Sequence, residues 1–237
     1  TISILLPYKE NYSPQYAGAV SLFVNDVTKV SAYKKNIMIF GNTMSKRKLS
    51  TNYINLDLNK KIFQSTSKIY IKSFLNAQKK LNPDLIEIHN RPNYVKLIKE
   101  KFINKLFLFF HNDPLTMSGS KTTAERIYLL NNLDKIIFNS KWSQNRFFVG
   151  LQNKNNLIHK TSVCYQSSSK TKINFNDKKK IISFVGKLNV AKGYDLFGLA
   201  IIKILNKYPD WQAKVFGDEP REKLTFEHKN LHILGFK

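Results

Sequence analysis

Short apolar runs alternate with amphipathic segments along most of the chain. Ile2–Leu6 has the length of a buried strand, and the segment from Gly18 to about Ser31 has apolar residues at helical spacing. The same alternation then repeats. Further strands are expected at 36–41, 53–56, 85–89, 106–110, 135–138 and 162–165. Because parallel strands need helical crossovers, this order predicts a doubly wound, Rossmann-like α/β domain.

Helices are expected between these strands. One is predicted at 62–81 and a shorter one at 93–101, each with apolar residues on one side. Thr122 and Glu125 have the spacing of a capping box, which predicts a helix start at that point. The buried face of that helix is expected to consist of Ile127, Leu130 and Leu133.

A second run of strand and helix begins at Ile181. It predicts a strand at 181–185, a loop ending at Gly193, a helix to about Tyr208, and further strands at 213–216 and 231–234. This run is too short for a usual nucleotide-binding domain. We therefore expect an incomplete second Rossmann-like domain.

The length of 237 residues exceeds what one typical domain needs, so two domains are expected. The stretch between the two runs is polar, rich in lysine and without apolar periodicity, which is typical of a linker. The expected boundaries are a first domain at 1–165, a linker at 166–180 and the start of a second domain at 181–237.

Charge and composition narrow the class of protein. The chain has 39 Lys and Arg against 16 Asp and Glu, a net charge of +23, which attracts nucleic acid, phosphorylated substrates or an anionic membrane. Because lysine, asparagine and isoleucine are abundant together, codon bias explains this charge equally well. A hydrophobic fraction of 42% excludes a disordered chain. The single cysteine, Cys164, excludes an internal disulfide framework and is expected to be a buried, inert thiol.

The longest apolar run, Leu106–Phe110, is far too short to span a bilayer. No signal peptide precedes the strand that begins at Ile2. We therefore expect a cytoplasmic protein, with peripheral contact at the inner face of the cytoplasmic membrane left open.

Polar residues follow the predicted strands directly. His89, Asn90 and Arg91 follow one strand and His111 follows the next, and such carboxyl ends meet at the edge where parallel sheets bind ligands. His111 can stabilise charge developing on a bound sugar or phosphate. The alternative, that His111 caps the turn at 112–114, is equally open.

Phosphate-binding candidates lie where loops enter helices. Gly18 would let backbone N–H groups approach an anion, although a packing glycine explains it as well. Lys187 and Lys192 flank the loop that leads into the helix after Gly193, so their charges suit a diphosphate. The glycine fingerprints of dinucleotide sites and P-loops are both absent. No D-x-D sequence or clustered His and Cys pattern predicts a metal site, and no cofactor is expected.

The segment F-V-G-K-L-N-V-A-K-G at 184–193 resembles the start of the donor-binding domain in retaining GT-B glycosyltransferases of the large family-four group. H-N-R-P at 89–92 and H-N-D-P at 111–114 are similar to bacterial polysaccharide or lipopolysaccharide members of that group. Other matching segments are G-A-V-S at 18–21, F-N-S-K-W at 138–142, V-F-G-D at 215–218 and L-H-I-L-G-F at 231–236. The resemblance covers nearly all of the chain. It implies a GT-B fold and a metal-independent hexosyltransferase that moves a sugar from a nucleotide-diphosphate sugar to a glycan or lipid-linked acceptor of the cell envelope.

The resemblance also implies roles for single residues. Lys187 and Lys192 would bind the diphosphate and stabilise the leaving group, and His111 would contact the transferring sugar. Lys187 stands where many members have arginine, so it offers a point charge rather than a bidentate contact. Gly18 and Gly217 would line the donor site. The candidates on the acceptor side are His89, Asn90 and Arg91.

Two expected features of the resembled family are missing. Its paired-glutamate motif, which holds the donor sugar and ribose, should lie beyond Gly235, and the sequence ends at Lys237. Y-Q-S-S-S at 165–169 replaces the usual N-G pair before the linker. We therefore expect a fragment, with a natural truncation of impaired catalysis as the other explanation. A catalytically incomplete sugar- or nucleotide-binding fragment is the alternative function, and a nucleic-acid-binding module is less favoured because no RNA-binding motif accompanies the charge. The sequence does not identify the sugar, base, acceptor or oligomeric state.

Overall fold

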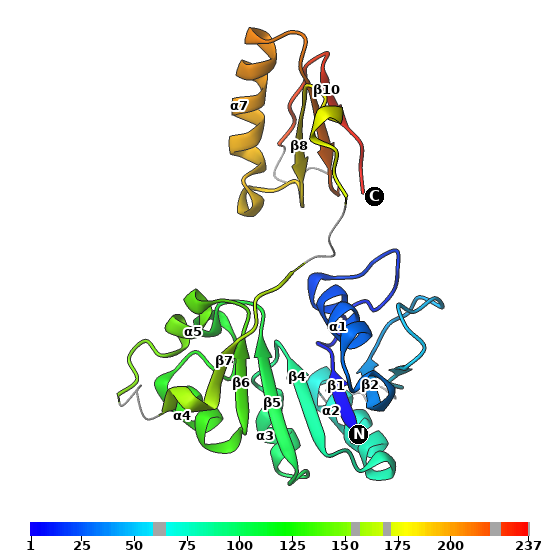
Figure 1. Cartoon of the computed structure of the whole chain (residues 1–237). Coiled ribbons are helices and arrows are strands. Elements are labelled where there is room, and N and C mark those ends of the chain that lie inside the picture. Colours follow the sequence, from blue (N-terminus) through cyan, green and yellow to red (C-terminus); the bar gives the residue numbers. More distant parts are fainter. Residues whose placement is uncertain (59–64, 153–156, 168–171, 219–223, 237) are drawn as a thin grey trace. The chain divides into compact units, whose positions relative to one another are not determined.

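The computed structural model describes residues 1–58, 65–152, 157–167, 172–218 and 224–236. The chain divides into two compact units, Thr1–Ser168 and Ser169–Lys237, and each is described by itself (Figure 1). The division falls inside the segment 166–180, of which residues 168–171 lie outside the described residues.

Unit 1 is built on a parallel sheet, which has seven strands within the described residues. Their order in the sheet is β3-β2-β1-β4-β5-β6-β7. The strands are β1 (Ile2–Leu5), β2 (Ile37–Gly41), β3 (Tyr53–Asn55), β4 (Leu85–His89), β5 (Lys105–Phe110), β6 (Lys135–Phe138) and β7 (Thr161–Val163). The strand order reverses between β1 and β4, and the carboxyl ends of two such strands flank the crevice where open α/β sheets bind ligands.

Helices cover both faces of this sheet (Figure 1). They are α1 (Ala19–Val30), α2 (Thr66–Leu81), α3 (Tyr94–Lys99), α4 (Thr123–Asn132) and α5 (Lys141–Phe147). Val20 and Val24 of α1 pack with Ile4 and Ile39 on one face. The other four helices contribute to a larger apolar cluster that contains Leu5, Phe40, Ile88, Leu108 and Phe138. This double covering is the Rossmann-like α/β architecture that the sequence predicts.

The start of α2 differs from the prediction. A helix was expected from residue 62, but α2 begins at Thr66 and Ile62 lies outside the described residues. Ser65 has extended backbone angles, and its side chain accepts a hydrogen bond from the Lys68 N–H. Because the backbone of a capping serine is not helical, the helix begins after Ser65 even though the helical spacing of apolar residues begins earlier in the sequence.

The expected buried face of α4 is partly wrong. Leu130 and Leu133 are buried, but Ile127 is 47% exposed, and Arg126 and Leu129 are buried instead. The capping box is confirmed, because Thr122 Oγ1 accepts from the Glu125 N–H at 3.2 Å and Glu125 Oε2 accepts from the Thr122 N–H at 2.8 Å.

The expectation of a buried Cys164 is wrong as well. The strand β7 ends at Val163, one residue before the cysteine, so the thiol lies in the following loop and is exposed. The backbone N–H of Cys164 still donates to the Phe138 carbonyl at 2.8 Å, which continues the ladder of β6 and β7 by one bond.

Unit 2 contains a parallel sheet in the order β10-β9-β8 within the described residues. Its elements are β8 (Ile181–Val185), α7 (Tyr194–Lys207), β9 (Gln212–Phe216) and β10 (Leu231–Ile233). Tyr194 and Ile201 of α7 pack against Val215 and Ala213 of β9. Among the described residues of both units, no helix combines the length and the apolarity that crossing a membrane requires.

Candidate functional site

The carboxyl edge of the unit 1 sheet carries a continuous set of polar contacts. His89, His111 and Asn139 each stand at or just after the end of β4, β5 and β6, so parallel pairing brings their backbones side by side. The ladder continues into the loops, because Asn90 N donates to Phe109 O at 2.7 Å and Asn139 N donates to Phe110 O at 3.1 Å. The sequence prediction that strand ends meet at one edge is confirmed.

His111 lies at the centre of this edge. Its Nε2 is 2.9 Å from Nδ1 of His89, and its Nδ1 is 3.2 Å from Nε2 of Gln166. The ring of Phe23, from α1, meets it edge-on with the centroids 5.1 Å apart. Burial, and secondarily the neighbouring His89, lower the pKa of His111 to about 3, so the ring is neutral at neutral pH.

The backbone of His111 is held from both sides. Its N–H donates to Asn90 Oδ1 at 3.2 Å, and its carbonyl accepts from Asn139 Nδ2 at 2.8 Å. Ser143 donates in turn to Asn139 Oδ1 at 2.6 Å. Asn90 has a φ of 56°, a left-handed conformation that asparagine tolerates better than most residues, and this turn directs its side chain to residue 111.

The three residues expected on the acceptor side differ in exposure. His89 is only 2% exposed and Asn90 is also buried, and both are engaged with the segment after β5. Arg91 is half-buried, and its NH1 donates to the Asn90 carbonyl at 2.7 Å. In unit 1, His89 and Asn90 are therefore buried residues that hold the ring and the backbone N–H of His111 in place.

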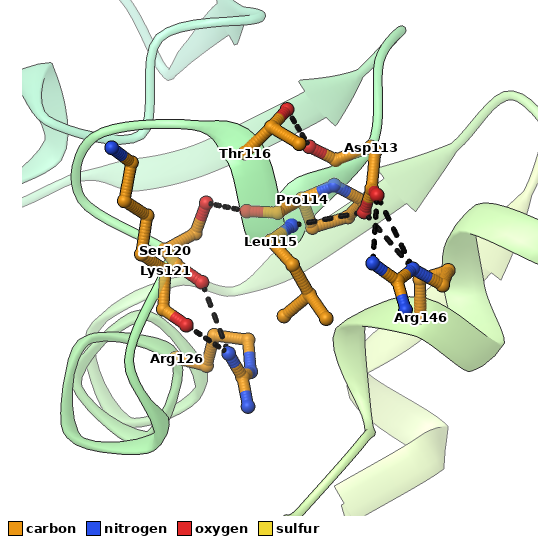
Figure 2. A network of polar contacts seen from close by, with 8 residues as sticks. All are labelled: Asp113, Pro114, Leu115, Thr116, Ser120, Lys121, Arg126 and Arg146. Atoms are coloured by element: carbon orange, nitrogen blue, oxygen red, sulfur yellow. Dashed lines mark hydrogen bonds and ion pairs between the residues drawn. The ribbon is translucent and has the colours of Figure 1, made fainter.

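The 3₁₀ turn after β5 is capped by Asp113 (Figure 2). Asp113 Oδ1 accepts from the Leu115 N–H at 3.0 Å, and its Oδ2 accepts from Arg146 NH2 at 2.9 Å. Burial alone would raise the pKa of Asp113, but the hydrogen bonds from Arg146 and from the Leu115 N–H outweigh it and lower the pKa. The described hydrogen bonds of the His111 ring go to His89 and Gln166, which argues against the capping alternative for His111.

Arg126 anchors the other end of the same loop (Figure 2). It is 2% exposed, and its guanidinium donates to the carbonyls of Ser120 at 3.2 Å and Lys121 at 2.7 Å, and also to Val149 O at 2.6 Å. Arg126 was not among the site residues predicted from the sequence. Its signal is the spacing three and four residues before Leu129 and Leu130, which places an arginine on the buried stripe of α4.

Gly18 lies at the start of α1, against the side chain of Glu10. The Glu10 Oε1 accepts from the Ser21 N–H at 3.0 Å, and a Cβ added at Gly18 would lie 2.2 Å from that oxygen. The chain's own carboxylate therefore occupies the anion position at this helix N-terminus. A phosphate at the same backbone groups would have to displace Glu10.

The lysines of unit 2 lie on a loop whose backbone is anchored. Leu188 is fully buried, its N–H donates to Asp218 Oδ1 at 3.1 Å, and Asn189 Oδ1 caps a short 3₁₀ turn by accepting from the Lys192 N–H at 3.1 Å. Lys187 and Lys192 are both exposed, and neither ammonium has an acidic partner within the described part of the chain.

Gly217 makes this loop geometry feasible. A Cβ at this position would lie 2.1 Å from the carbonyl oxygen of Gly186 and 2.8 Å from the Leu188 side chain. The Gly186 N–H also donates to the Phe216 carbonyl at 2.9 Å. Gly193, with a φ of 72°, then supplies the left-handed residue that joins the 3₁₀ turn to α7.

The site residues of the two units are thus His111 with its supports in unit 1 and the loop of Lys187 and Lys192 in unit 2. Among the described residues, no three His, Cys, Asp or Glu side chains gather into a group that could hold a metal ion.

No protein-family model matches the sequence. The sequence is 22% identical over 248 residues to a protein of Haemophilus influenzae described as an uncharacterized glycosyltransferase. The matched region covers 90% of this chain and 66% of that protein.

Solved structures resemble the fold over nearly the whole chain. Sucrose-phosphate synthase from Thermosynechococcus elongatus has a TM-score of 0.66 at 12% identity, covering 94% of this chain and 63% of that one. HepE from Anabaena in complex with UDP-glucose has a TM-score of 0.63 at 16% identity, covering 99% and 69%. UDP-GlcNAc 2-epimerase from Neisseria meningitidis has a TM-score of 0.58 at 13% identity, covering 100% and 72%. The chain spans less than two thirds of the length of the Haemophilus protein and of the synthase. It is an α/β protein of GT-B-like fold, similar in sequence to a protein described as an uncharacterized glycosyltransferase and in fold to proteins solved with UDP-glucose or UDP-GlcNAc.

Proposed function

We propose that this chain belongs to a retaining glycosyltransferase that uses a nucleotide-diphosphate sugar. The observation that carries the proposal is the loop from Gly186 to Gly193, whose backbone is anchored while Lys187 and Lys192 stay exposed and without an acidic partner among the described residues. Two free ammonium groups before α7 can neutralise a diphosphate. The similarity to a described glycosyltransferase and to a fold solved with UDP-glucose supports this choice of ligand.

Lys187 and Lys192 stabilise the departing nucleotide diphosphate in this proposal. A hydrogen bond to a charged group contributes about 1.5–3 kcal/mol, so the two lysines together can lower the barrier to departure of the leaving group appreciably. Because they supply the positive charge that a cation would otherwise supply, the proposed transfer needs no metal.

His111 contacts the sugar, and Arg91 lies on the side of the acceptor. A neutral imidazole can accept a hydrogen bond from a sugar hydroxyl, and the low pKa of His111 keeps it neutral throughout the physiological range. His89 and Asn90 act by holding His111. Gly18 leaves room for the Glu10 carboxylate at the start of α1, and Gly217 lets the Gly186 carbonyl approach closely.

The proposed acceptor is a polysaccharide, a lipopolysaccharide or a lipid-linked molecule of the cell envelope, reached from the cytoplasm. The net charge of +23 supports peripheral contact with an anionic membrane surface, where each lysine or arginine near the headgroups adds about 1 kcal/mol of attraction.

A panel of UDP-, GDP- and ADP-sugars tests the proposal. Calorimetry should detect binding of one of these nucleotide-diphosphate sugars to the chain. Lys192→Ala should weaken binding of the nucleotide diphosphate at least tenfold and leave binding of the nucleoside unchanged. Lys203→Ala, which removes one exposed charge from the middle of α7, is the matched control and should bind like the parent.

Three outcomes distinguish the functions. Sugar transfer that persists in the presence of a chelator supports the proposal, and donor binding without transfer supports an incomplete sugar-binding fragment. No binding of any nucleotide sugar, together with tight and salt-sensitive binding of oligonucleotides, would contradict the proposal and favour a nucleic-acid-binding module. Product analysis by NMR separates transfer from epimerisation of the donor.

A further inference from the structure

We propose that Glu87 and His89 are positioning residues that hold the neutral His111 ring in a single tautomer, with its proton on Nε2 and its lone pair on Nδ1. In consequence, and resting on the proposed function, Nδ1 of His111 recognises a group that donates a proton, such as a sugar hydroxyl, and not an anionic phosphate oxygen.

Glu87 and His89 lie two residues apart in β4, so both side chains project from the same face of the sheet. The Glu87 Oε2 is 3.7 Å from the His89 Nε2, which is too long for a hydrogen bond but close enough for the carboxylate charge to act on the ring. His89 is 2% exposed and stacks on Phe109 with the ring centroids 4.6 Å apart. The dielectric screening between carboxylate and imidazole is therefore weaker than in water.

The carboxylate selects which nitrogen of His89 carries the proton. His89 Nε2 is buried and has no hydrogen-bond partner in the described part of the chain. A proton on Nε2 places a positive dipole end toward the Glu87 carboxylate, whereas a lone pair there would place negative charge against negative charge. The favoured tautomer therefore has the proton on Nε2 of His89 and the lone pair on Nδ1.

This choice passes along the hydrogen bonds to His111. The lone pair on His89 Nδ1 must accept at 2.9 Å, so His111 donates from Nε2. A neutral ring has one proton, which leaves the His111 Nδ1 as an acceptor. The amide of Gln166, an exposed residue, meets that nitrogen at 3.2 Å, and an amide N–H is the donor that this position requires.

The opposite order is disfavoured at both ends. If His111 donated from Nδ1, then His89 would have to donate from its own Nδ1 and turn the Nε2 lone pair toward Glu87. The Gln166 amide would then have to present its oxygen instead of its NH₂ group. A hydroxyl of a bound sugar can take the place of the Gln166 amide as the donor, while a phosphate oxygen without a proton cannot.

Side-chain NMR of the nitrogen-15-labelled chain tests the proposal directly. The sequence contains five histidines, so replacing His159, His228 and His232 by glutamine leaves only the signals of His89 and His111. At neutral pH we expect both rings to be protonated on Nε2. Protonation of His111 on Nδ1, a charged His111, or an equal mixture of tautomers in the parent would overturn the proposal.

The Glu87→Gln variant removes the charge and keeps the shape. We expect its histidine signals to shift toward a mixture of tautomers, whereas Glu100→Gln, which removes an exposed charge at the end of α3, should leave them unchanged. Unaltered tautomers in a folded Glu87→Gln variant would contradict the inference. The measurement on the parent decides the question even if this variant does not fold.

A binding arm separates this inference from the proposed function. Glu87→Gln should weaken binding of the nucleotide-diphosphate sugar by roughly 2- to 10-fold, which corresponds to about one neutral hydrogen bond, and leave binding of the nucleotide diphosphate unchanged. Equal losses for both ligands would contradict a role toward a sugar hydroxyl. The NMR result needs no ligand, so a correct tautomer without donor binding would contradict the proposed function alone.

Discussion

The contact between Glu10 and Gly18 permits a sharp test of why a glycine stands at the start of α1. In Gly18→Ala the new Cβ would lie 2.2 Å from Glu10 Oε1, whereas a non-bonded carbon and oxygen stay more than 3.0 Å apart. The carboxylate must move away, and its hydrogen bond from the Ser21 N–H, now 3.0 Å, is lost. The backbone itself accepts alanine, because Gly18 has φ −79° and ψ 170°.

The expected change in stability follows from two opposing terms. Loss of the Glu10 contact resembles the loss of a helix cap, which lowers the free energy of unfolding by about 1 kcal/mol. Replacing glycine by alanine restricts the unfolded chain and stabilises by about 0.4–1 kcal/mol. The single variant should therefore be destabilised by roughly 0–0.6 kcal/mol. In a Glu10→Ala background only the second term remains, so the same substitution should be neutral or stabilising.

A double-mutant cycle in urea, followed by far-ultraviolet circular dichroism, measures this coupling between Glu10 and Gly18. We expect about 1 kcal/mol, and Glu10→Gln, which keeps an acceptor oxygen, should retain part of it. Equal effects of Gly18→Ala in both backgrounds would refute the explanation. If Gly18→Ala then also weakened nucleotide-sugar binding in both backgrounds, the glycine would instead serve the ligand.

Three further predictions concern the loop after β5 and the neighbouring edge of the sheet. Arg126→Met should lower the free energy of unfolding by about 2–4 kcal/mol, because three carbonyls lose a charged donor. Thermal denaturation should then show a lower Tm, and an unchanged Tm would contradict the anchoring role of Arg126. Because the pKa of Asp113 is lowered in the folded state, this carboxylate stabilises the fold at pH values above its unfolded pKa of about 3.9, and the contribution is lost as pH falls through the folded pKa. Asp113→Asn should therefore reduce the loss of unfolding free energy at acidic pH. An unchanged dependence of stability on acidic pH would argue against the pair with Arg146. Cys164 should react with a thiol reagent in the folded state at a rate close to that of the urea-unfolded chain, and protection of the thiol would contradict its exposed position.

Local signals in the sequence predicted much of the site. A buried strand followed by polar residues places His89 and His111 correctly at the carboxyl edge, because strand ends depend on short-range patterns of apolar residues. The capping box of Thr122 and Glu125 was also predicted, since its partners are three residues apart.

The errors arise where exposure depends on the neighbours of an element. Ile127 and Cys164 were assigned to the interior from their apolar character, but both are exposed. The buried side of α4 is shifted by one residue from the predicted one, so Arg126 is buried in place of Ile127. The strand β7 ends at Val163, so the thiol of Cys164 lies in a loop. These shifts are decided by packing against the sheet, which a pattern along one element does not contain.

The sequence by itself determined the order of strands and helices, the polar residues after each strand and the lysine loop before α7, because each of these depends on residues close together in the chain. Only the tertiary structure decided which of those residues meet. The pairing of β4 with β5 joins His89 to His111, 22 residues apart, and the end of β7 brings Gln166 to the same ring across 55 residues. The tertiary structure also decided that Glu10 accepts from the backbone at the start of α1, beside Gly18, and that Glu87 lies next to Nε2 of His89. Hydrogen bonds between distant segments are set by sheet order and helix packing, so the partners of a side chain follow from the fold and not from its position in the sequence.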